Sequence, residues 1–412
     1  MAKIRLAVIF GGRACEHDVS IVSALQCMDA VNTQDYDVVP VYIARDGAWY
    51  TGAPLRRLET LKEFDPAAPG IVRVYPDVTS GSGALLSVEK KKGLFSGGDA
   101  LTVAERIDVA MPVLHGMNGE DGTVQGLLEL MNVPYTSSGL VGSAVGMDKI
   151  AMRQLFRGCG FPVLESVWLT REEWEKDAVA VVRRVEEALR YPVFVKPANL
   201  GSSIGISRAK DAAALGEAIA VALSYDRRVI VETGVQDAVE VNCSVLGFDA
   251  DATPSVCEMP MHWQEFLTFD EKYLRGGKSG AAKGSAAKGG GGMETLSRKI
   301  PAPIGEEKTE IIQKLAVDVF RALDCKGVVR IDFLLDGEKI YVNEINTIPG
   351  SLAFYLWEPM GIPYPDLIER MVEYALRAHA EKNRAVFAFD SNLLTQCALG
   401  QKGAKRGVAN NG

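Results

Sequence analysis

Four side chains near the C-terminal end of the chain are of the types that bind metal ions and phosphates. Arg330 and Asp332 lie two residues apart, as do Glu344 and Asn346, and the residues around both pairs are mostly apolar. Side chains two apart share one face of a β-strand. Two carboxylates, a carboxamide oxygen and a guanidinium on one face would suit Mg²⁺ carrying phosphates, because such ions take few protein oxygens. We therefore predict a metal and phosphate site here.

The strands that would position these side chains flank Asp336-Gly337, which is a strong hairpin signal. The length of the hairpin loop decides whether the two pairs share a face. A two-residue turn at residues 336–337 would place Glu344 on the face opposite to Asp332. A three-residue loop, residues 335–337, would bring all four polar groups together. The metal site requires the second arrangement, and a solvated face of an edge hairpin is the competing interpretation.

The composition limits the class of protein. A chain of 412 residues is long enough for two or three domains. The net charge of −8 argues against non-specific nucleic-acid binding. Seven cysteines without a CxxC pair fit a reduced cytosol. The start MAKIRLAVIFGG is too short in apolar residues for a signal peptide, and no apolar run approaches membrane-spanning length. We expect a cytoplasmic protein that binds neither nucleic acid nor membranes.

The first third of the chain alternates strands with helices. Residues 4–10 form an apolar run stopped by two glycines, which is typical of a buried parallel strand. The other strands and helices expected there lie at residues 19–31 (helix), 37–43 (strand), 107–114 (strand) and before Met131 (helix). This alternation predicts an α/β, doubly wound N-terminal domain over residues 1–137, with its site at the carboxyl ends of the strands.

The rest of the chain mixes antiparallel strands with helices, so we expect α+β architecture there. We divide it into a central subdomain (138–236), a C-terminal subdomain with the hairpin (237–384) and a flexible tail (385–412). Residues 276–292 are rich in Gly and Lys and cannot bury a core. Their Gly-Lys-Ser triplet is not a P-loop, because Lys272 occupies the position of the required glycine.

Lys196 ends an apolar strand and is followed by the Gly-Ser-Ser turn at residues 201–203. An ammonium beside hydroxyl and backbone donors suits a polyphosphate. A solvated hairpin tip is an equally good interpretation of this motif alone. Evidence for nucleotide binding is weaker still for three other single residues: Lys149, Glu232 and Glu240.

The order of the motifs along the chain is far more specific than any single motif. Along the chain they read FGGRACEHDVS, HGMNGEDGTVQG, YTSSGLVGSAVGMDK, VKPANLGSSIGI, VIVE, DEKYL, GVVRIDF and NEINTIPG. This series resembles that of the D-alanine–D-alanine ligases of the ATP-grasp superfamily, over roughly residues 4–377. The resemblance implies an ATP-grasp fold and an ATP-dependent synthesis of D-alanyl-D-alanine for peptidoglycan, by a protein that forms homodimers.

The resemblance also implies a role for each matching residue. ATP would be bound by Lys149, Lys196, Ser203, Glu232, Thr233, Val235, Glu240 and Lys272. Two Mg²⁺ ions, or Mn²⁺ in their place, would be bound by Asp332, Glu344 and Asn346. The first D-alanine would be held by Glu16, Ser202, Tyr273 and His115. The oxyanion of the tetrahedral intermediate would be stabilised by Arg330 and Gly350, and the second substrate bound by Tyr355 and Leu356.

The implied chemistry needs no covalent nucleophile. A carboxylate is a poor acyl donor until ATP phosphorylates it, and phosphoryl transfer relies on positioning, metals and cations. The acyl phosphate must be shielded from water, and residues 266–299 are placed to form a closing lid. Three features depart from the family pattern: Ala14 replaces a serine, the lid is longer, and SLAFYLWEP follows Gly350.

Two other functions compete with this one. The chain could be an ATP-grasp ligase for a different acceptor, such as a D-alanine–D-serine ligase. It could also be a nucleotide-binding regulator without catalysis. The acidic residues of the hairpin and Arg330 argue against the regulator, because a sensor has no use for contacts to a transition state.

Overall fold

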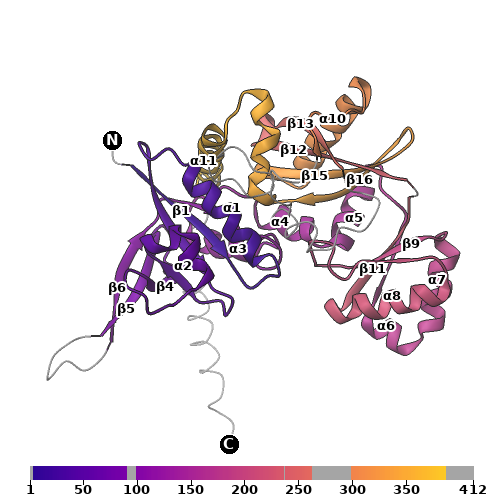
Figure 1. Ribbon diagram of the computed structural model, residues 1–412, viewed down its shortest axis with the longest axis horizontal. Helices are drawn as coiled ribbons and strands as arrows, with labels where there is room; N and C mark the ends of the chain where they lie inside the picture. The colour runs from indigo at the N-terminus through magenta and orange to yellow at the C-terminus, as the bar shows by residue number, and fades with distance from the viewer. Residues whose placement is uncertain (1–2, 91–98, 236, 262–297, 387–412) are drawn as a thin grey trace, which may run out of the picture.

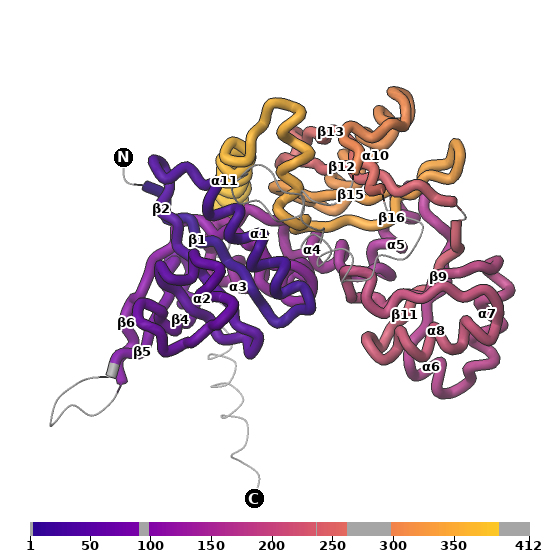
Figure 2. Tube along the Cα trace, viewed as in Figure 1, coloured from indigo at the N-terminus to yellow at the C-terminus, as the bar shows by residue number. Residues whose placement is uncertain are grey.

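A computed structural model describes residues 3–90, 99–235, 237–261 and 298–386 of the chain. Figures 1 and 2 show three bodies: an N-terminal domain, a central subdomain that carries β9 and β11, and a C-terminal subdomain. Each body is built on a sheet of its own. The helices between β7 and β8 run from the first body toward the other two, and the domain boundaries given above stay a prediction.

The N-terminal domain has the expected α/β character, with a sheet that is mixed rather than wholly parallel. Its strand order is β6-β5-β4-β3-β2-β1-β7, and β1 runs parallel to β2 and β7, while the remaining neighbours are antiparallel. The strands are β1 (Ile4–Gly11), β2 (Tyr36–Ile43), β3 (Trp49–Thr51), β4 (Val72–Pro76), β5 (Ala84–Lys90), β6 (Asp99–Arg106) and β7 (Val109–Pro112). The predicted run from 107 to 114 is thus longer than the strand it contains.

Both faces of β1 are covered, which explains why its sequence is continuously apolar. Leu6, Val8 and Phe10 pack with α1 (His17–Ala30) and α11 (Tyr364–Lys382). The alternate residues Ala7 and Ile9 pack with α3 (Thr123–Met131). Short helices η1 (Ala53–Arg56) and α2 (Leu58–Lys62) complete the domain.

The central subdomain contains a four-stranded antiparallel sheet with the order β10-β9-β11-β8. Its strands are β8 (Ser166–Thr170), β9 (Val193–Pro197), β10 (Ser207–Ala209) and β11 (Arg228–Thr233). The associated helices are α4 (Leu140–Met147), α5 (Lys149–Gly158), α6 (Arg171–Lys176), α7 (Ala178–Ala188) and α8 (Ala212–Tyr225). Apolar residues of α7 and α8 cover one face of the sheet, so the other face is available to a ligand.

The C-terminal sheet has the order β14-β13-β12-β15-β16, and all of its pairs are antiparallel. Its strands are β12 (Val239–Phe248), β13 (Thr253–Pro260), β14 (Arg298–Lys299), β15 (Lys326–Asp336) and β16 (Lys339–Asn346). Helix α10 (Glu306–Ala322) packs on this sheet, and α11 packs between it and the N-terminal domain (Figures 1 and 2). The 3₁₀ segments are η2 (Asp249–Asp251), η5 (Gly350–Leu356) and η6 (Glu358–Met360).

The β15–β16 hairpin differs from both loops that we considered. Asp336 pairs with Lys339, so the turn has two residues, Gly337 and Glu338. Gly337 has φ 59°, a left-handed value that glycine adopts without strain. Both predicted loops are therefore wrong in position, and a turn of this length alone would place Glu344 and Asp332 on opposite faces.

A β-bulge restores the expected arrangement. Phe333 pairs with Val342, but Asp332 pairs with Glu344, so Asn343 is an extra residue in β16. Beyond this point the register is shifted by one, and Arg330 pairs with Asn346. Paired residues of antiparallel strands share a face, so the bulge brings the four polar side chains together. A bulge of this kind leaves no distinct mark in the sequence.

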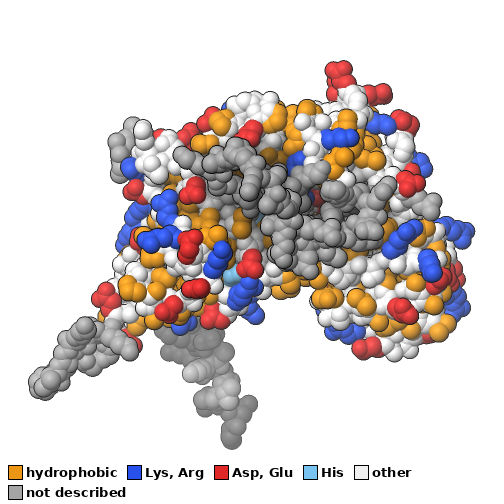
Figure 3. Space-filling view, in the orientation of Figure 1, with side chains coloured by type: hydrophobic (Ala, Val, Ile, Leu, Met, Phe, Trp, Pro, Cys, Tyr) orange, Lys and Arg blue, Asp and Glu red, His pale blue; other side chains and the backbone are white. Residues whose placement is uncertain are grey.

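The face of the molecule in Figure 3 carries charges of both signs, interspersed with apolar side chains in its described parts. Among the helices of the described ranges, none combines the length and the apolar character that crossing a membrane requires.

Candidate active site

A cavity of about 1090 Å³ lies where the three bodies meet. It brings together most of the residues singled out from the sequence. Those from the N-terminal domain and central subdomain are Glu16, His115, Lys149, Lys196, Ser202, Ser203, Glu232, Thr233 and Val235. Those from the C-terminal subdomain are Glu240, Arg330, Asp332, Glu344, Asn346 and Gly350.

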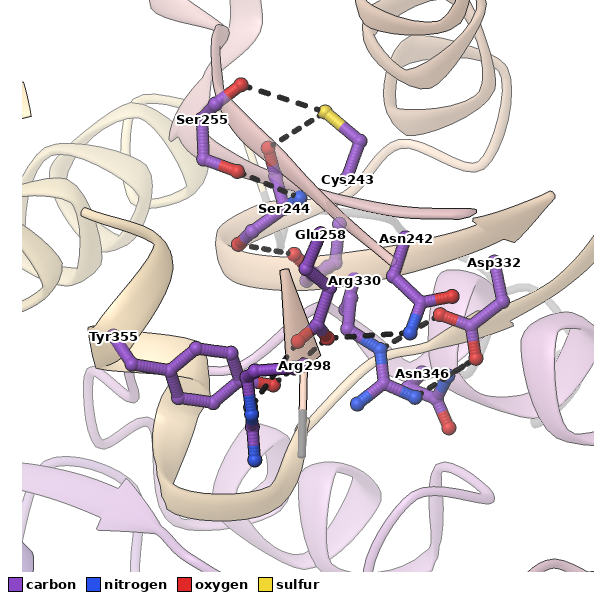
Figure 4. Close-up of polar contacts among 11 residues, drawn as sticks. Asn242, Cys243, Ser244, Ser255, Glu258, Arg298, Arg330, Asp332, Asn346 and Tyr355 are labelled. Atoms are coloured by element: carbon purple, nitrogen blue, oxygen red, sulfur yellow. Dashed lines mark hydrogen bonds and ion pairs between the residues drawn. The ribbon is translucent and has the colours of Figure 1, made fainter. Parts of the chain in front are cut away.

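Arg330 and Asp332, which both line the cavity, form a largely buried ion pair (Figure 4). Nε and Nη2 of Arg330 donate to the two oxygens of Asp332, at 2.7 and 2.8 Å. Burial opposes the charge of Arg330, but Asp332 outweighs it and raises the pKa of the guanidinium. Arg330 is therefore a permanent cation beside the two carboxylates of the hairpin.

The oxygen donors of this face fit a divalent ion such as Mg²⁺. Asp332 and Glu344 supply carboxylates, and the amide nitrogen of Asn346 donates to Asp332 at 3.0 Å, which turns the amide oxygen of Asn346 away from that carboxylate. Within the described ranges, no group of three or more His, Cys, Asp or Glu residues forms a metal site. Two carboxylates and one amide leave coordination positions for phosphate and water, as Mg²⁺ prefers.

Glu16 and Ser202 meet across the cavity although 186 positions separate them in the chain. Ser202 Oγ donates to Glu16 Oε1 at 2.8 Å, as the predicted orientation of Glu16 requires. A Cβ at Gly201 would lie 2.9 Å from Glu16 Oε1, so a larger residue there would force the carboxylate to shift. The N-terminal domain and the central loop are thus joined at the predicted site of the first amino acid.

His115 is buried and also lines the cavity. Its Nδ1 donates to the carbonyl oxygen of Ile348 at 2.9 Å, and its Nε2 lies 3.1 Å from Ser23 Oγ. Burial lowers the pKa of His115 to about 4, so the imidazole is neutral at physiological pH. A neutral His115 fixes the position of the loop that leads to Gly350.

Glu120 is a site residue that we did not predict. It lines the cavity, and the backbone N–H groups of Gly116 and Ile348 donate to it at 2.9 and 3.0 Å. Burial raises the pKa of Glu120 to about 7 in spite of these donors. It stands in the same Gly-rich motif as His115, and this proximity in the sequence was the available signal.

The titration of His115 predicts a specific loss of stability in acid. Its folded pKa is below the unfolded value, so the stability provided by the neutral imidazole is complete above pH 6.5 and falls as the pH drops toward 4. Between pH 7 and 4, the free energy of unfolding of the native protein should fall by roughly 3 kcal/mol more than that of His115→Gln. Urea unfolding at several pH values measures this. If the free energies of unfolding of the two proteins changed with pH in parallel, this prediction would be contradicted. The raised pKa of Glu120 acts in the opposite direction, but Glu120 is present in both proteins, so its effect cancels in the comparison.

Glu232 is buried between two cations on the nucleotide side of the cavity. Nε of Arg153 donates to its Oε1 at 2.9 Å, and Nζ of Lys196 lies 2.6 Å from its Oε2. Although burial opposes its charge, Arg153 and Lys196 hold the pKa of Glu232 at about 2. The predicted partner of adenine is thus an ion-paired carboxylate, and its role at adenine stays a prediction.

Two further residues were missed at this end of the cavity. Arg153 stands four positions after Lys149 on α5, a spacing that places both on one helix face and could have indicated it. Asn343 is the bulge residue, lines the cavity, and has a buried amide oxygen with no hydrogen-bond partner in the described part of the chain. Its orientation depends on the bulge and was not readable from the sequence.

The structure does not place Tyr355 and Leu356 with the other predicted residues. Leu356 is fully buried in the apolar core. The Tyr355 hydroxyl donates to Glu258 at 3.0 Å, and the guanidinium of Arg298 lies against the Tyr355 ring (Figure 4). Neither lines the cavity. Within η5, Ser351, Leu352 and Ala353 have left-handed backbone conformations. All residues from Ser351 to Leu356 are buried. The Leu356 side chain therefore lies in the apolar core, and the binding of the second substrate by Tyr355 and Leu356 stays a prediction.

Lys272 and Tyr273 lie outside the described residues. The same holds for the expected lid at 266–299, of which Arg298 and Lys299 are described as β14. Their predicted roles are neither supported nor contradicted by the geometry.

Two family models match the chain. The model described as D-ala D-ala ligase N-terminus matches residues 5–138, and the model described as D-ala D-ala ligase C-terminus matches residues 155–373. The D-alanine–D-alanine ligase of Geobacillus thermodenitrificans is 38% identical over 395 residues, which are 94% of this chain and 100% of that protein. That of Heliobacterium modesticaldum is 40% identical over 391 residues, 93% of this chain and 98% of that protein.

Solved structures agree with these matches. The D-alanine-D-alanine ligase from Coxiella burnetii is similar with a TM-score of 0.73 and 26% identity, over 98% of this chain and 99% of that one. The VanG D-Ala:D-Ser ligase from Enterococcus faecalis is similar with a TM-score of 0.74 and 28% identity, over 91% of this chain and 100% of that one. The chain therefore belongs to the D-alanine–D-alanine ligase family, ATP-dependent ligases with the ATP-grasp fold.

Proposed function

We propose that the protein joins two D-alanine molecules, with cleavage of ATP to ADP and phosphate, through a D-alanyl phosphate. The single observation that carries this proposal is the cavity itself. It is lined by Glu16, by Arg330, Asp332 and Glu344 of the hairpin face, and by two lysines, Lys149 and Lys196. The dipeptide is a building block of peptidoglycan, and we place the reaction in the cytoplasm, where ATP is available.

Different groups of cavity residues bind the phosphates, the nucleoside and the metal ions in this proposal. Lys149 and Lys196 bind the ATP phosphates, and Ser203 adds a hydroxyl donor. Glu232, Thr233, Val235 and Glu240 surround the adenine and the ribose. Asp332, Glu344 and Asn346 hold two Mg²⁺ ions, or Mn²⁺, whose chemistry is to neutralise the charge of the transferring phosphoryl group.

The acyl-transfer end of the cavity lies next to the metal face. Glu16, oriented by Ser202, binds the ammonium of the first D-alanine, and His115 supports the loop behind it. Arg330 and the backbone N–H of Gly350 stabilise the oxyanion that forms when the second amine attacks. Lys272 and Tyr273 contribute from the lid.

The acceptor is D-alanine in this proposal. Ligases of this family that use D-lactate carry a histidine in the lid where this chain has the Lys272-Tyr273 pair. D-serine is the second candidate, because the similar solved structures include a D-Ala:D-Ser ligase and a pocket rejects one added hydroxyl by about a hundredfold at best. We also propose a homodimer as the assembly.

Phosphate release in the presence of ATP and Mg²⁺ tests the function. D-alanine alone should stimulate it, and kcat/KM at neutral pH should fall in the order D-alanine, D-serine, D-lactate as the acceptor. A regulator would bind ATP without releasing phosphate on addition of D-alanine. A higher kcat/KM for D-serine would make the protein a D-alanine–D-serine ligase, and a higher value for D-lactate would overturn the role given to the lid.

A further inference from the structure

Arg153 is a buried cation to which the proposed reaction gives no task. It lies on α5, its side chain is 3% exposed, and it does not line the cavity. All three nitrogens of its guanidinium donate hydrogen bonds: Nε and Nη2 donate to Oε1 of Glu232, and Nη1 donates to the carbonyl oxygen of Val342 at 2.9 Å. Removing a guanidinium from water is costly, so a buried arginine needs a compensating contact, which Glu232 supplies.

Glu232 is shared by two cations. Its Oε1 accepts from Arg153, and its Oε2 pairs with Nζ of Lys196 at 2.6 Å. One carboxylate cannot neutralise two cations, so one positive charge of this triad is in excess. The excess charge is that of Lys196, because its side chain is 13% exposed and lines the cavity.

Arg153 determines whether the charge of Glu232 stays compensated when a ligand binds. When a phosphate draws Lys196 away, Glu232 loses one of its two cations, and a buried carboxylate without a cation is strongly disfavoured. Arg153 remains in place, because its contact with the Val342 carbonyl ties it to β16, the strand that carries Glu344. Glu232 therefore stays compensated after Lys196 leaves.

We propose that Arg153 is a positioning residue that neutralises Glu232 and so releases Lys196 to bind a phosphate of the nucleotide. Without Arg153, Lys196 is the only cation within contact of Glu232 among the described ion pairs, and the pair holds it away from the ligand. This inference rests on the proposed function in that it takes ATP as the ligand.

The test compares Arg153→Met with the matched control Arg157→Met. Arg157 lies one helical turn further along α5 and also pairs with a glutamate, Glu165, but at the exposed surface. Arg153→Met should raise KM for ATP by about tenfold to hundredfold, the value of one charge-assisted contact, with a much smaller change in kcat. Arg157→Met should leave both constants unchanged. Thermal unfolding ensures that each protein is assayed while folded.

A second substitution separates this role from a merely structural one. Glu232→Gln removes the charge that holds Lys196 but keeps an oxygen acceptor. If Arg153 acts through Glu232, the double variant Arg153→Met/Glu232→Gln should have a KM for ATP within about threefold of that of Glu232→Gln alone. Neither protein contains a Glu232 without a cation. Because Glu232→Gln leaves the buried Arg153 without its carboxylate, thermal unfolding must show that both proteins are folded before their KM values are compared.

Each outcome decides the inference. An unchanged KM for ATP in Arg153→Met would overturn it, and so would a double variant that is more than about threefold worse than Glu232→Gln. Calorimetric titration with ATP is run on every protein. Absence of phosphate release by the native protein would contradict the proposed function, whereas the ATP affinities would still test Arg153.

Discussion

Replacing Glu344 with glutamine should abolish turnover while the fold remains intact. Glu344 pairs with Asp332 across the hairpin, and Gln has nearly the same shape but carries no charge for a divalent ion. The loss of one of two carboxylates from the metal face should lower kcat by roughly 10³-fold or more. Phosphate release measured over a range of Mg²⁺ concentrations tests this, together with circular dichroism to verify the fold.

The control for this variant is Glu338→Gln. Glu338 is in the turn of the same hairpin, its side chain is 91% exposed, and its ion pair with Lys308 is at the surface. Such a pair contributes little, so activity should be unchanged. Normal turnover by Glu344→Gln at ordinary Mg²⁺ would refute the assignment of the metal face.

Substitution of Arg330 should have the next largest effect. Its guanidinium makes two parallel contacts with Asp332 and lines the cavity, and in the proposed reaction it stabilises the developing negative charge. Loss of one such donor costs about 10²–10³-fold in kcat, and we expect this loss for Arg330→Met with a smaller change in KM. Arg330→Lys should recover little of it, because an ammonium cannot form the bidentate contact.

Steady-state kinetics of the Met and Lys variants provide the measurement, with Arg321→Met as the control. Arg321 lies on α10 and donates to the Ala250 carbonyl oxygen at the surface, so its removal should not alter kcat. Native kcat in Arg330→Lys would mean that charge alone suffices, and native kcat in Arg330→Met would remove Arg330 from the reaction.

Local sequence was sufficient for β1, α1, β2, β7 and the two strands of the hairpin, but β3 to β6 were not predicted individually. The apolar run that becomes β1 and the alternation in β15 and β16 depend on burial of one or two faces, and this pattern is visible in the residues themselves. The spacing of Arg330 with Asp332, and of Glu344 with Asn346, was likewise enough to place each pair on one face of its strand. The ordered motifs identified the family.

The tertiary structure alone decided how these pieces meet. The common face of the hairpin depends on the bulge at Asn343, because one extra residue reverses the parity of every later side chain. The environments of His115 and Glu120 depend on the loop at Ile348, more than 200 positions away. The pairing of Arg153 with Glu232 joins α5 to β11. Burial and charge compensation are properties of the folded arrangement, and no local pattern encodes them.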